Sequence, residues 1–413
     1  MEQKNKINLL SLAIVIGLFV AIAFHYIAFI YYQNSDFKSF LPHPPEISPF
    51  GDLLIIEYTA RTLNPYIHKM GGSYFPLSYI FVYPFGFYSR SISALIYSFI
   101  FIGSLFRLNY YFIGKYQNNN FEKIQTSLIF TLLTYPTLFT LERGNIEGII
   151  TIFCALSIIF YIDKKYILSA VILGLAAAMK GYAGIFIFLF ILDKRWKESF
   201  ITCATTGLST LFSLLLFRDE LSVQIPNMIK NFGAFTNWIS SQSHISPYSS
   251  DLFDFFDFYF KSPENHNSFM LYYTIGAALF LASVIAILFL CKEKVLWKKI
   301  AAITCCSLLL PQSSFDYHMM RIYLPLWLFI NYNSKNIQSK KMDYFYTIIF
   351  ATLLIPKHYF YIFGHPSSHI LSSTALLMML GGIMIENIIN KFKNQAESVR
   401  NINFTKLSST KAN

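Results

Sequence analysis

The 413-residue sequence carries little charge: Asp, Glu, Lys and Arg make up only 13% of it, whereas 54% of its residues are hydrophobic. A soluble chain of this length has roughly a quarter of charged residues, so the composition excludes a soluble globular protein. Apolar runs of about 20 residues recur along nearly the whole chain, and each can cross a hydrocarbon layer ~30 Å thick. The sequence therefore predicts an all-α polytopic membrane protein.

Several other features are scarce or missing. The five cysteines fall inside apolar runs without the spacing of a metal site, so we interpret them as small core residues without disulfides. No glycine-rich phosphate loop is visible. There is no strong internal repeat, which argues against the two related halves of many transporters. No small-residue cleavage site follows the first apolar run, so we expect that run to remain as a helix.

Basic residues outnumber acidic ones by 33 to 22, which gives a net charge of +11. They are spread over short loops rather than gathered in one patch, so we expect no nucleic-acid partner. A cytoplasmic N-terminus places 21 of the 33 Lys and Arg residues in cytoplasmic segments, as the positive-inside rule requires. This assignment of loops to the two sides of the membrane holds only if the short segment 75–88, which contains Pro76 and Pro84, does not cross the membrane. We therefore predict about twelve spans plus one re-entrant or interfacial piece.

The predicted organisation is one membrane domain over residues 1–390, with outer loops at 33–91 and 218–268 and a basic cytoplasmic tail at 391–413. High usage of Lys, Asn, Ile and Phe suggests an AT-rich bacterial genome, and therefore a bacterial inner membrane with both termini in the cytoplasm. The predicted spans are approximately 8–32, 92–112, 124–141, 146–162, two short spans that meet at 180–182, 198–217, 269–291, 300–312, 322–332, 343–362 and 368–390.

This topology gathers polar residues from distant parts of the chain on the outer face. Charges near lipid are costly and usually serve a function. A carboxylate there could deprotonate a hydroxyl group, and cations could hold a phosphate. We expect Asp52 to be the base. The gathered residues are Asp52, Glu57, Arg61, His68, Glu142, Arg143, Asn145, Glu147, Lys180, Asp316, His318 and Arg321.

Structural interpretations of the same residues stay open at this point. Asp52 could cap a helix, Glu142 and Arg143 could form an interfacial ion pair, Lys180 could extend to the membrane surface, and His318 could be an ordinary interfacial histidine.

A separate acidic series, Asp251, Asp254 and Asp257, lies among phenylalanines and resembles a set of metal ligands. Its spacing of three fits an amphipathic surface helix better, so we expect no metal site.

Short elements follow one another in a distinctive order. The first-loop aspartate precedes Asn64-Pro65-Tyr66, Tyr74-Phe75-Pro76-Leu77, Arg143-Gly144-Asn145, an alanine-rich span that ends at Lys180, and a Pro-Gln-Ser…Tyr-His element over residues 311–318. In this order they resemble the integral-membrane glycosyltransferases of the GT-C superfamily, and most closely glycosyltransferase family 87. The resemblance covers about residues 8–390.

The resemblance implies a single-subunit inverting enzyme in a GT-C-like bundle. Its donor would be a polyprenyl-phosphate sugar, with mannose the leading candidate, and its acceptor a lipid-linked or other glycan at the outer face. Asp52 matches the proposed base of the family, His318 a histidine near the active site, and Lys180 a lysine near the lipid phosphate.

The remaining site residues follow from chemistry. Arg143 and Arg321 could add positive charge at the departing phosphate without a metal or cofactor. The remaining expected substrate-binding residues are Asn145, Glu142, Tyr66 and Tyr74, of which the two tyrosines could stack on a sugar ring.

Two other functions remain open. A polymerase or ligase of lipid-linked polysaccharide also has about twelve spans, but its key residues are usually arginines in large outer loops. Loop 218–268 contains only Arg218, Lys230 and Lys261 as cations. A transporter or flippase would be expected to place its polar residues near the midplane rather than at one face.

Overall fold

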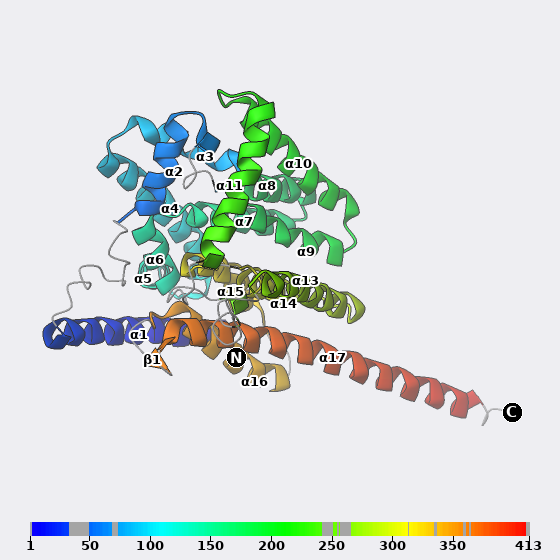
Figure 1. Ribbon diagram of the computed structural model, residues 1–413. Helices are drawn as coiled ribbons and strands as arrows, with labels where there is room; N and C mark the ends of the chain where they lie inside the picture. The colour runs from blue at the N-terminus through cyan, green and yellow to red at the C-terminus, as the bar shows by residue number, and fades with distance from the viewer. Residues whose placement is uncertain are drawn as a thin grey trace.

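A computed structural model of the chain describes residues 2–32, 49–67, 73–241, 251–253, 256, 266–312, 314–333, 337–357, 361–362 and 365–409. The predicted all-helical class is confirmed for these residues, apart from one small hairpin. Its strands are β1 (Tyr361–Ile362) and β2 (His365–Pro366), with Tyr361 opposite Pro366. Figure 1 shows α1, α16 and α17 at the bottom of the view, α13 to α15 above them, and α2 to α4 and α7 to α10 at the top.

The helices in chain order are α1 (Gln3–Tyr32), α2 (Gly51–Arg61), η2 (Pro65–Ile67), α3 (Pro76–Val82), η3 (Tyr83–Phe87), α4 (Arg90–Phe112), η4 (Gly114–Tyr116), α5 (Asn120–Leu132), α6 (Tyr135–Arg143), α7 (Glu147–Ile162), α8 (Tyr166–Met179), η5 (Gly181–Phe186), α9 (Ile187–Leu192), α10 (Trp196–Leu215), α11 (Leu221–Ser241), α13 (His266–Leu290), α14 (Leu296–Leu309), η7 (Asp316–Ile322), α15 (Tyr323–Asn331), α16 (Ile337–Leu354) and α17 (Ser367–Ser409).

Four helical segments of the described chain are long and apolar enough to cross a membrane: Gln3–Phe24, Arg90–Tyr116, Ser268–Leu290 and Ile370–Lys393. The bent pair α5 and α6 could form a fifth span. Other apolar helices are shorter. Helix α7, with 16 residues, is about 24 Å long at ~1.5 Å per residue. Membrane character is therefore supported, whereas the count of about twelve spans stays a prediction.

The predicted span 124–141 is bent, because α5 and α6 meet at an angle of 57°. Pro136 lies in the first turn of α6, where it cannot continue the hydrogen bonding of α5 and disfavours a helical conformation just before it. Thr134 at this break lies 2.6 Å from the Tyr323 hydroxyl group. The bend directs the end of α6, with Arg143, toward α2.

The proline-containing segment 75–88 forms two short helices rather than one long one. Helix α3 has 7 residues and η3 has 5, so neither is long enough to cross a membrane. The Ser78 hydroxyl group donates to the carbonyl of Met179 at 2.5 Å. This contact fixes α3 against the end of α8, immediately before Lys180.

Small and hydroxylated residues allow close packing of α7, α8 and α10. A Cβ added to Gly174 of α8 would lie 2.6 Å from Cβ of Thr205. The hydroxyl groups of Ser157 and Ser169 each donate to the other's carbonyl at 2.8 Å, and Thr206 donates to the Gly174 carbonyl at 3.2 Å. Such contacts are typical of helix pairs within membranes.

Buried and partly buried ion pairs connect α1, the end of α9, α14, α16 and α17 at one end of the helix bundle. Lys6 Nζ lies 3.2 Å from the Asp343 carboxylate, Lys298 lies 2.7 Å from Glu386, and Lys299 pairs with Asp193. Each cation has its own carboxylate. The basic members belong to the segments predicted to be cytoplasmic. These residues, named the Lys299 layer, are Lys6, Asp193, Lys298, Lys299, Asp343 and Glu386.

The regions predicted as an outer loop and as a tail both contain helical residues. The predicted outer loop 218–268 includes α11, a helix of 21 residues with Pro226 inside it. The predicted tail 391–413 is not separate from the bundle's last helix, because α17 continues to Ser409. Figure 1 shows α17 extending beyond the other helices toward the C-terminus.

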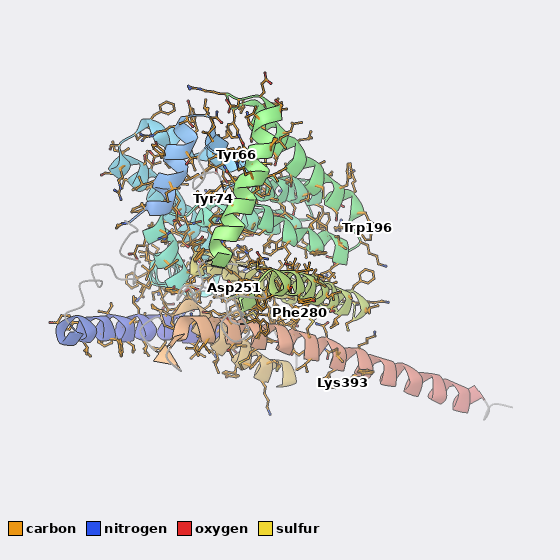
Figure 2. The ribbon with its side chains drawn as sticks, viewed as in Figure 1. Tyr66, Tyr74, Trp196, Asp251, Phe280 and Lys393 are labelled. Atoms are coloured by element: carbon orange, nitrogen blue, oxygen red, sulfur yellow. The ribbon has the colours of Figure 1, made fainter. Side chains whose placement is uncertain are left out.

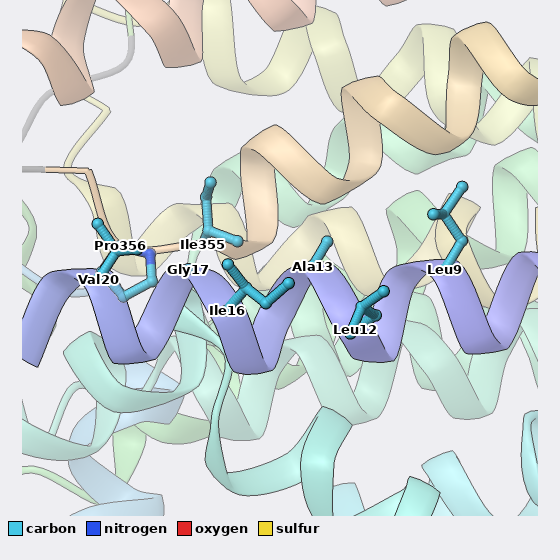
Figure 3. Close-up of a pocket in the computed structure, with 8 residues that line it drawn as sticks. All are labelled: Leu9, Leu12, Ala13, Ile16, Gly17, Val20, Ile355 and Pro356. Carbon is cyan, nitrogen blue, oxygen red and sulfur yellow. The ribbon is translucent and has the colours of Figure 1, made fainter.

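An apolar groove of about 510 Å³ runs between α1 and the end of α16 (Figure 3). Gly17 makes room for it, since a Cβ there would lie 2.6 Å from a side-chain carbon of Ile355. Its lining contains no charged or hydrogen-bonding side chain, so we assign it no chemistry. The lining residues are Leu9, Leu12, Ala13, Ile16, Gly17, Val20, Ile355 and Pro356.

Candidate active site

Asp52 lies in the first turn of α2, where the helix N-terminus favours an acidic side chain. The chain enters this helix through Phe50, which has a left-handed φ of 60° and whose amide donates to the Glu142 carbonyl at 2.7 Å. That hydrogen bond joins the start of α2 to the end of α6. Asp52 is only 9% exposed, so it is a nearly buried carboxylate.

Arg143 and Asn145 hold the Asp52 carboxylate. Arg143 donates to Oδ1 through Nη2 and to Oδ2 through Nε at 3.3 Å, and Asn145 Nδ2 donates to Oδ2 at 2.7 Å. Gly144, between them, has a φ of 63°, and a Cβ there would lie 2.9 Å from the ring of Phe50. The Arg-Gly-Asn element is therefore a tight turn that directs two donors to one carboxylate.

Glu147, at the start of α7, is fully buried, and three other residues of the outer-face set converge on it. Its Oε1 accepts a hydrogen bond from Arg321 Nε at 2.9 Å, and its Oε2 lies 3.5 Å from Lys180 Nζ and 3.7 Å from His318 Nε2. Sequence reasoning placed Glu147 on this face without giving it a role. The available signal was its position as the single charge of an apolar helix.

Arg321 is firmly held. Besides its bond to Glu147, it donates through Nη1 to the Ser307 carbonyl at 3.0 Å, and its guanidinium carbon lies 3.6 Å from the ring centroid of Tyr182. It is 2% exposed. Arg321 therefore connects α7, α14 and η5 as much as it adds charge.

Lys180 is held more loosely, by a 3.2 Å contact to Asn145 Oδ1 and the 3.5 Å contact to Glu147. Three tyrosine rings surround its ammonium group, with centroids 5.2–5.4 Å away. Burial and the nearby Arg321 lower the pKa of Lys180, whereas Glu147 opposes that shift. These rings belong to Tyr74, Tyr182 and Tyr317.

His318 is 8% exposed, and burial lowers its pKa well below the usual value, with Arg321 and Lys180 adding to the effect. It is therefore neutral at pH 7. Its Nδ1 and the hydroxyl group of Tyr182 are buried without a hydrogen-bond partner in the described part of the chain. Their rings lie 5.0 Å apart. Buried polar atoms are normally satisfied, so such a pair fits a place where a ligand binds.

The seven residues Asp52, Arg143, Asn145, Glu147, Lys180, His318 and Arg321 are named the Asp52 cluster. More than half of the chain, residues 73–313, matches the sequence model of glycosyltransferase family 87. The chain belongs to glycosyltransferase family 87. The family 87 segment includes Arg143, Asn145, Glu147 and Lys180, whereas Asp52 precedes it and His318 and Arg321 follow it. No curated protein matches the chain.

Tyr74 and Tyr66, close to the start of the family 87 segment, occupy different places (Figure 2). The Tyr74 ring lies beside Lys180. Tyr66 is 2% exposed, packs against Tyr79 and Phe217, and donates its hydroxyl hydrogen to the Tyr74 carbonyl at 3.0 Å. Tyr66 therefore holds the backbone of Tyr74 in place and is not part of the Asp52 cluster.

Three further members of the predicted set are not part of the cluster. Glu57 pairs with Arg61 one turn along α2, at 2.8 Å. Glu142 is joined to the site through its carbonyl, which accepts the amide of Phe50. His68 lies outside the described residues.

A second buried pair, Asp316 and Lys357, lies beside the cluster. Burial raises the pKa of Asp316 to about 6, and the charge of Lys357 opposes the shift. Tyr135 donates to Asp316 at 2.6 Å. The hydrogen bond from Tyr135 joins the start of α6 to η7, the element that carries His318 and Arg321.

Asp251 accepts the Ser314 amide at 2.6 Å and so connects the segment before α13 to η7. Asp254 and Asp257 lie outside the described residues. Within the described ranges, no three His, Cys, Asp or Glu side chains gather as a metal site would require. The absence of a metal stays a prediction.

Proposed function

We propose that this family 87 protein transfers a single sugar, mannose or another hexose, from a polyprenyl-phosphate donor to a lipid-linked or glycan acceptor. The observation that carries the proposal is the Asp52 carboxylate, which two donors orient beside a lysine that no carboxylate holds closely. Family membership supports glycosyl transfer. The Lys299 layer, whose three lysines belong to the predicted cytoplasmic segments, supports a reaction at the outer face.

The charge of the Asp52 cluster suits a phosphodiester donor. Three cations, Arg143, Lys180 and Arg321, face two carboxylates, Asp52 and Glu147, and His318 is neutral. The cluster therefore has one positive charge in excess. A polyprenyl-phosphate sugar carries one negative charge, so its binding would neutralise the site.

Asp52 is proposed as the general base. A carboxylate has about four lone-pair sites, and Arg143 and Asn145 fill three of them, which leaves one for an acceptor hydroxyl group. The acceptor oxygen forms a bond to the anomeric carbon while its proton moves to Asp52. The bond from the anomeric carbon to the phosphate oxygen breaks, and the phosphate keeps the electron pair. A single displacement of this kind inverts the anomeric centre.

Lys180 is proposed to stabilise the leaving phosphate, because its contacts are long enough to be exchanged for a substrate oxygen. Arg321 keeps its bonds to Glu147 and Ser307 and acts from a fixed position. Neutral His318 would donate or accept a hydrogen bond at the sugar or phosphate. Tyr74 and Tyr317 could pack on the sugar ring. The donor is already activated, so the proposal needs no cofactor or metal.

The test is sugar transfer in proteoliposomes, with a panel of polyprenyl-phosphate monosaccharides and a native lipid extract as acceptor. Wild type should form product with one donor, and Asp52→Asn should form at least about 100-fold less, because base catalysis contributes 10²–10⁴-fold. Glu57→Gln, which makes the same charge change on the same helix, is the control and should remain active. Retained turnover by Asp52→Asn would show that Asp52 is not the base.

If no monosaccharide donor gives product, lipid-linked oligosaccharides are tested next. Their joining would indicate a polymerase or ligase. Counterflow of radiolabelled substrate without a covalent product would indicate a transporter. Either result would overturn the proposal.

A further inference from the structure

A pocket of about 430 Å³ lies at the opposite end of the bundle from the Asp52 cluster, where α9 ends and the turn between α13 and α14 begins. One part of its wall is apolar, and the rest is formed by charged residues of two turns. Neither the proposed transfer reaction nor the family 87 match gives it a role. Its lining residues are Leu192, Asp193, Lys194, Leu288, Phe289, Lys292, Glu293, Lys294 and Lys299.

The acidic residues of this pocket are already engaged. Asp193 pairs with Lys299 and accepts a hydrogen bond from the Tyr161 hydroxyl group. Glu293 Oε1 accepts the amide of Val295 at 2.7 Å, at the start of α14. Each of the two carboxylates of the pocket therefore already has a partner in the protein.

The remaining three cations, Lys194, Lys292 and Lys294, are exposed and have no ion-pair partner among the described residues. Lys194 Nζ lies 5.7 Å from the ring centroid of Phe289, which places the ammonium over the apolar wall. Three unpaired ammonium groups around one pocket would bind a negatively charged group.

The backbone fixes two of these lysines in an uncommon conformation. Lys194 and Lys292 have left-handed φ values of 57° and 52°, directly after α9 and α13. In both turns the next amide donates five residues back, to Phe190 at 2.8 Å and to Leu288 at 3.1 Å. Glycine is the usual residue at such helix ends. At the other end of the bundle Gly144 fills this position, whereas here lysine does.

The apolar wall continues into an exposed apolar surface of α13. Leu288 and Phe289 lie at the end of the candidate span Ser268–Leu290, of which only 11% is buried. Leu279 and Leu290 of this helix are 64% and 62% exposed. A lipid beside α13 would therefore lay its chains along the helix and bring its head group to the three lysines.

We infer that this pocket binds the head group of an anionic phospholipid, with the phosphate at Lys194, Lys292 and Lys294 and an acyl chain along α13. The inference is independent of the proposed transfer reaction. Phosphate could also come from solution, but the apolar wall and the lipid-facing helix favour the lipid.

The test uses the full chain in neutral detergent with added phosphatidylglycerol or phosphatidylcholine, and native mass spectrometry counts the bound lipids. Wild type is expected to retain one phosphatidylglycerol at least about tenfold more tightly than phosphatidylcholine. The triple variant K194Q/K292Q/K294Q should weaken phosphatidylglycerol binding on the order of 100-fold, because each lysine near an anionic head group contributes about fivefold. The triple variant K164Q/K165Q/K197Q makes the same charge change with exposed lysines of neighbouring turns and should bind as wild type does.

Three results would overturn the inference. Equal losses in the two triple variants would show diffuse charge attraction without a site. Displacement by millimolar inorganic phosphate would assign the pocket to a soluble phosphate. Equal binding of the two lipids by the wild type would remove the head-group preference. If the triple variant fails to fold, two measurements still decide the question. One is the comparison of the two lipids with the wild type. The other is the exposed single change K292Q, which should weaken phosphatidylglycerol binding about fivefold.

Discussion

The Asp52 cluster and the Lys299 layer are two buried groups of charges at opposite ends of the same helices, and they are built differently. Helix α14 (Leu296–Leu309) carries Lys298 and Lys299 in its first turn and, close to its other end, Ser307, whose carbonyl binds Arg321. In the Lys299 layer each cation has one carboxylate, as in the pairs Lys298–Glu386 at 2.7 Å and Lys6–Asp343 at 3.2 Å. In the Asp52 cluster Glu147 is shared among three partners at 2.9–3.7 Å.

This difference distinguishes charges that stabilise the fold from charges that can bind a substrate. Matched pairs leave no charge to bind another molecule, and breaking one leaves a buried charge without its partner. The Asp52 cluster instead keeps an excess cation and the unpartnered Nδ1 of His318. Such incomplete satisfaction lowers stability and is expected where a substrate completes the contacts.

The largest effect of a cation change is expected at Lys180. Lys180→Gln should lower kcat/KM for sugar transfer about 100-fold, because a donor aimed at a developing charge contributes 10²–10³-fold. The melting temperature should change little, since both contacts of Lys180 are long. Lys164→Gln, in an exposed turn, is the control. Full activity of Lys180→Gln would contradict this role and would indicate that Arg143 or Arg321 stabilises the leaving phosphate.

The next effect concerns the Lys299 layer. Lys6→Met leaves Asp343 buried without its cation, so we expect a loss of about 3 kcal/mol of unfolding free energy. Unfolding by denaturant in mixed micelles measures it, and transfer per folded molecule should stay within about twofold. Lys4→Met is the matched control, because Lys4 is 38% exposed and lies 3.8 Å from Glu122, so its pair should contribute less than about 1 kcal/mol. Equal losses in both variants would contradict a buried structural pair.

A smaller, pH-dependent effect is expected at Asp316. Its pKa is raised to about 6 by burial, so the fold favours its protonated form. Its stabilising contribution is complete below about pH 4 and is lost as the pH rises through 6. Asp316→Asn cannot ionise, so the melting temperature of the variant relative to that of the wild type should rise between pH 4 and 7. The exposed Asp163→Asn should show a constant difference, and a constant difference for Asp316→Asn would contradict the buried position.

The smallest effect is expected at Tyr66. Tyr66→Phe removes the hydrogen bond to the Tyr74 carbonyl, which contributes about 1 kcal/mol, and should raise the KM for the donor a few-fold without changing kcat. Tyr74→Phe keeps the ring beside Lys180 and should transfer sugar nearly as the wild type does. A large fall in kcat for Tyr66→Phe would place its hydroxyl group in the reaction instead.

Periodicity and charge bias predicted the helices and brought Asp52, Arg143, Lys180 and His318 to one end of the bundle, because alternate span ends share a face. The role of Glu147 could not be predicted in this way. An acid in the first turn of a helix is common, and only the three-dimensional structure shows that three cationic or histidine side chains reach it.

Other misses have identifiable causes. Pro136 signals the bend between α5 and α6, but the apolar run across it predicted one span without a break. Tyr66 was expected to bind substrate by stacking on a sugar ring. In the structure Asn231 of α11 donates to its carbonyl at 2.9 Å, and α11 lies in a region predicted to be a loop. Contacts between segments so far apart are not encoded in local patterns.

The most direct measurement compares Asp52→Asn with Asp343→Asn, which remove one buried carboxylate charge from each charge group. Transfer per folded molecule and unfolding free energy are measured for both variants in the same proteoliposomes and micelles. We predict that Asp52→Asn keeps its stability and loses at least about 100-fold in transfer, whereas Asp343→Asn loses stability and keeps transfer within about twofold. If Asp52→Asn transfers sugar at the wild-type rate, or if both variants lose only stability, the Asp52 cluster is not the site of the reaction.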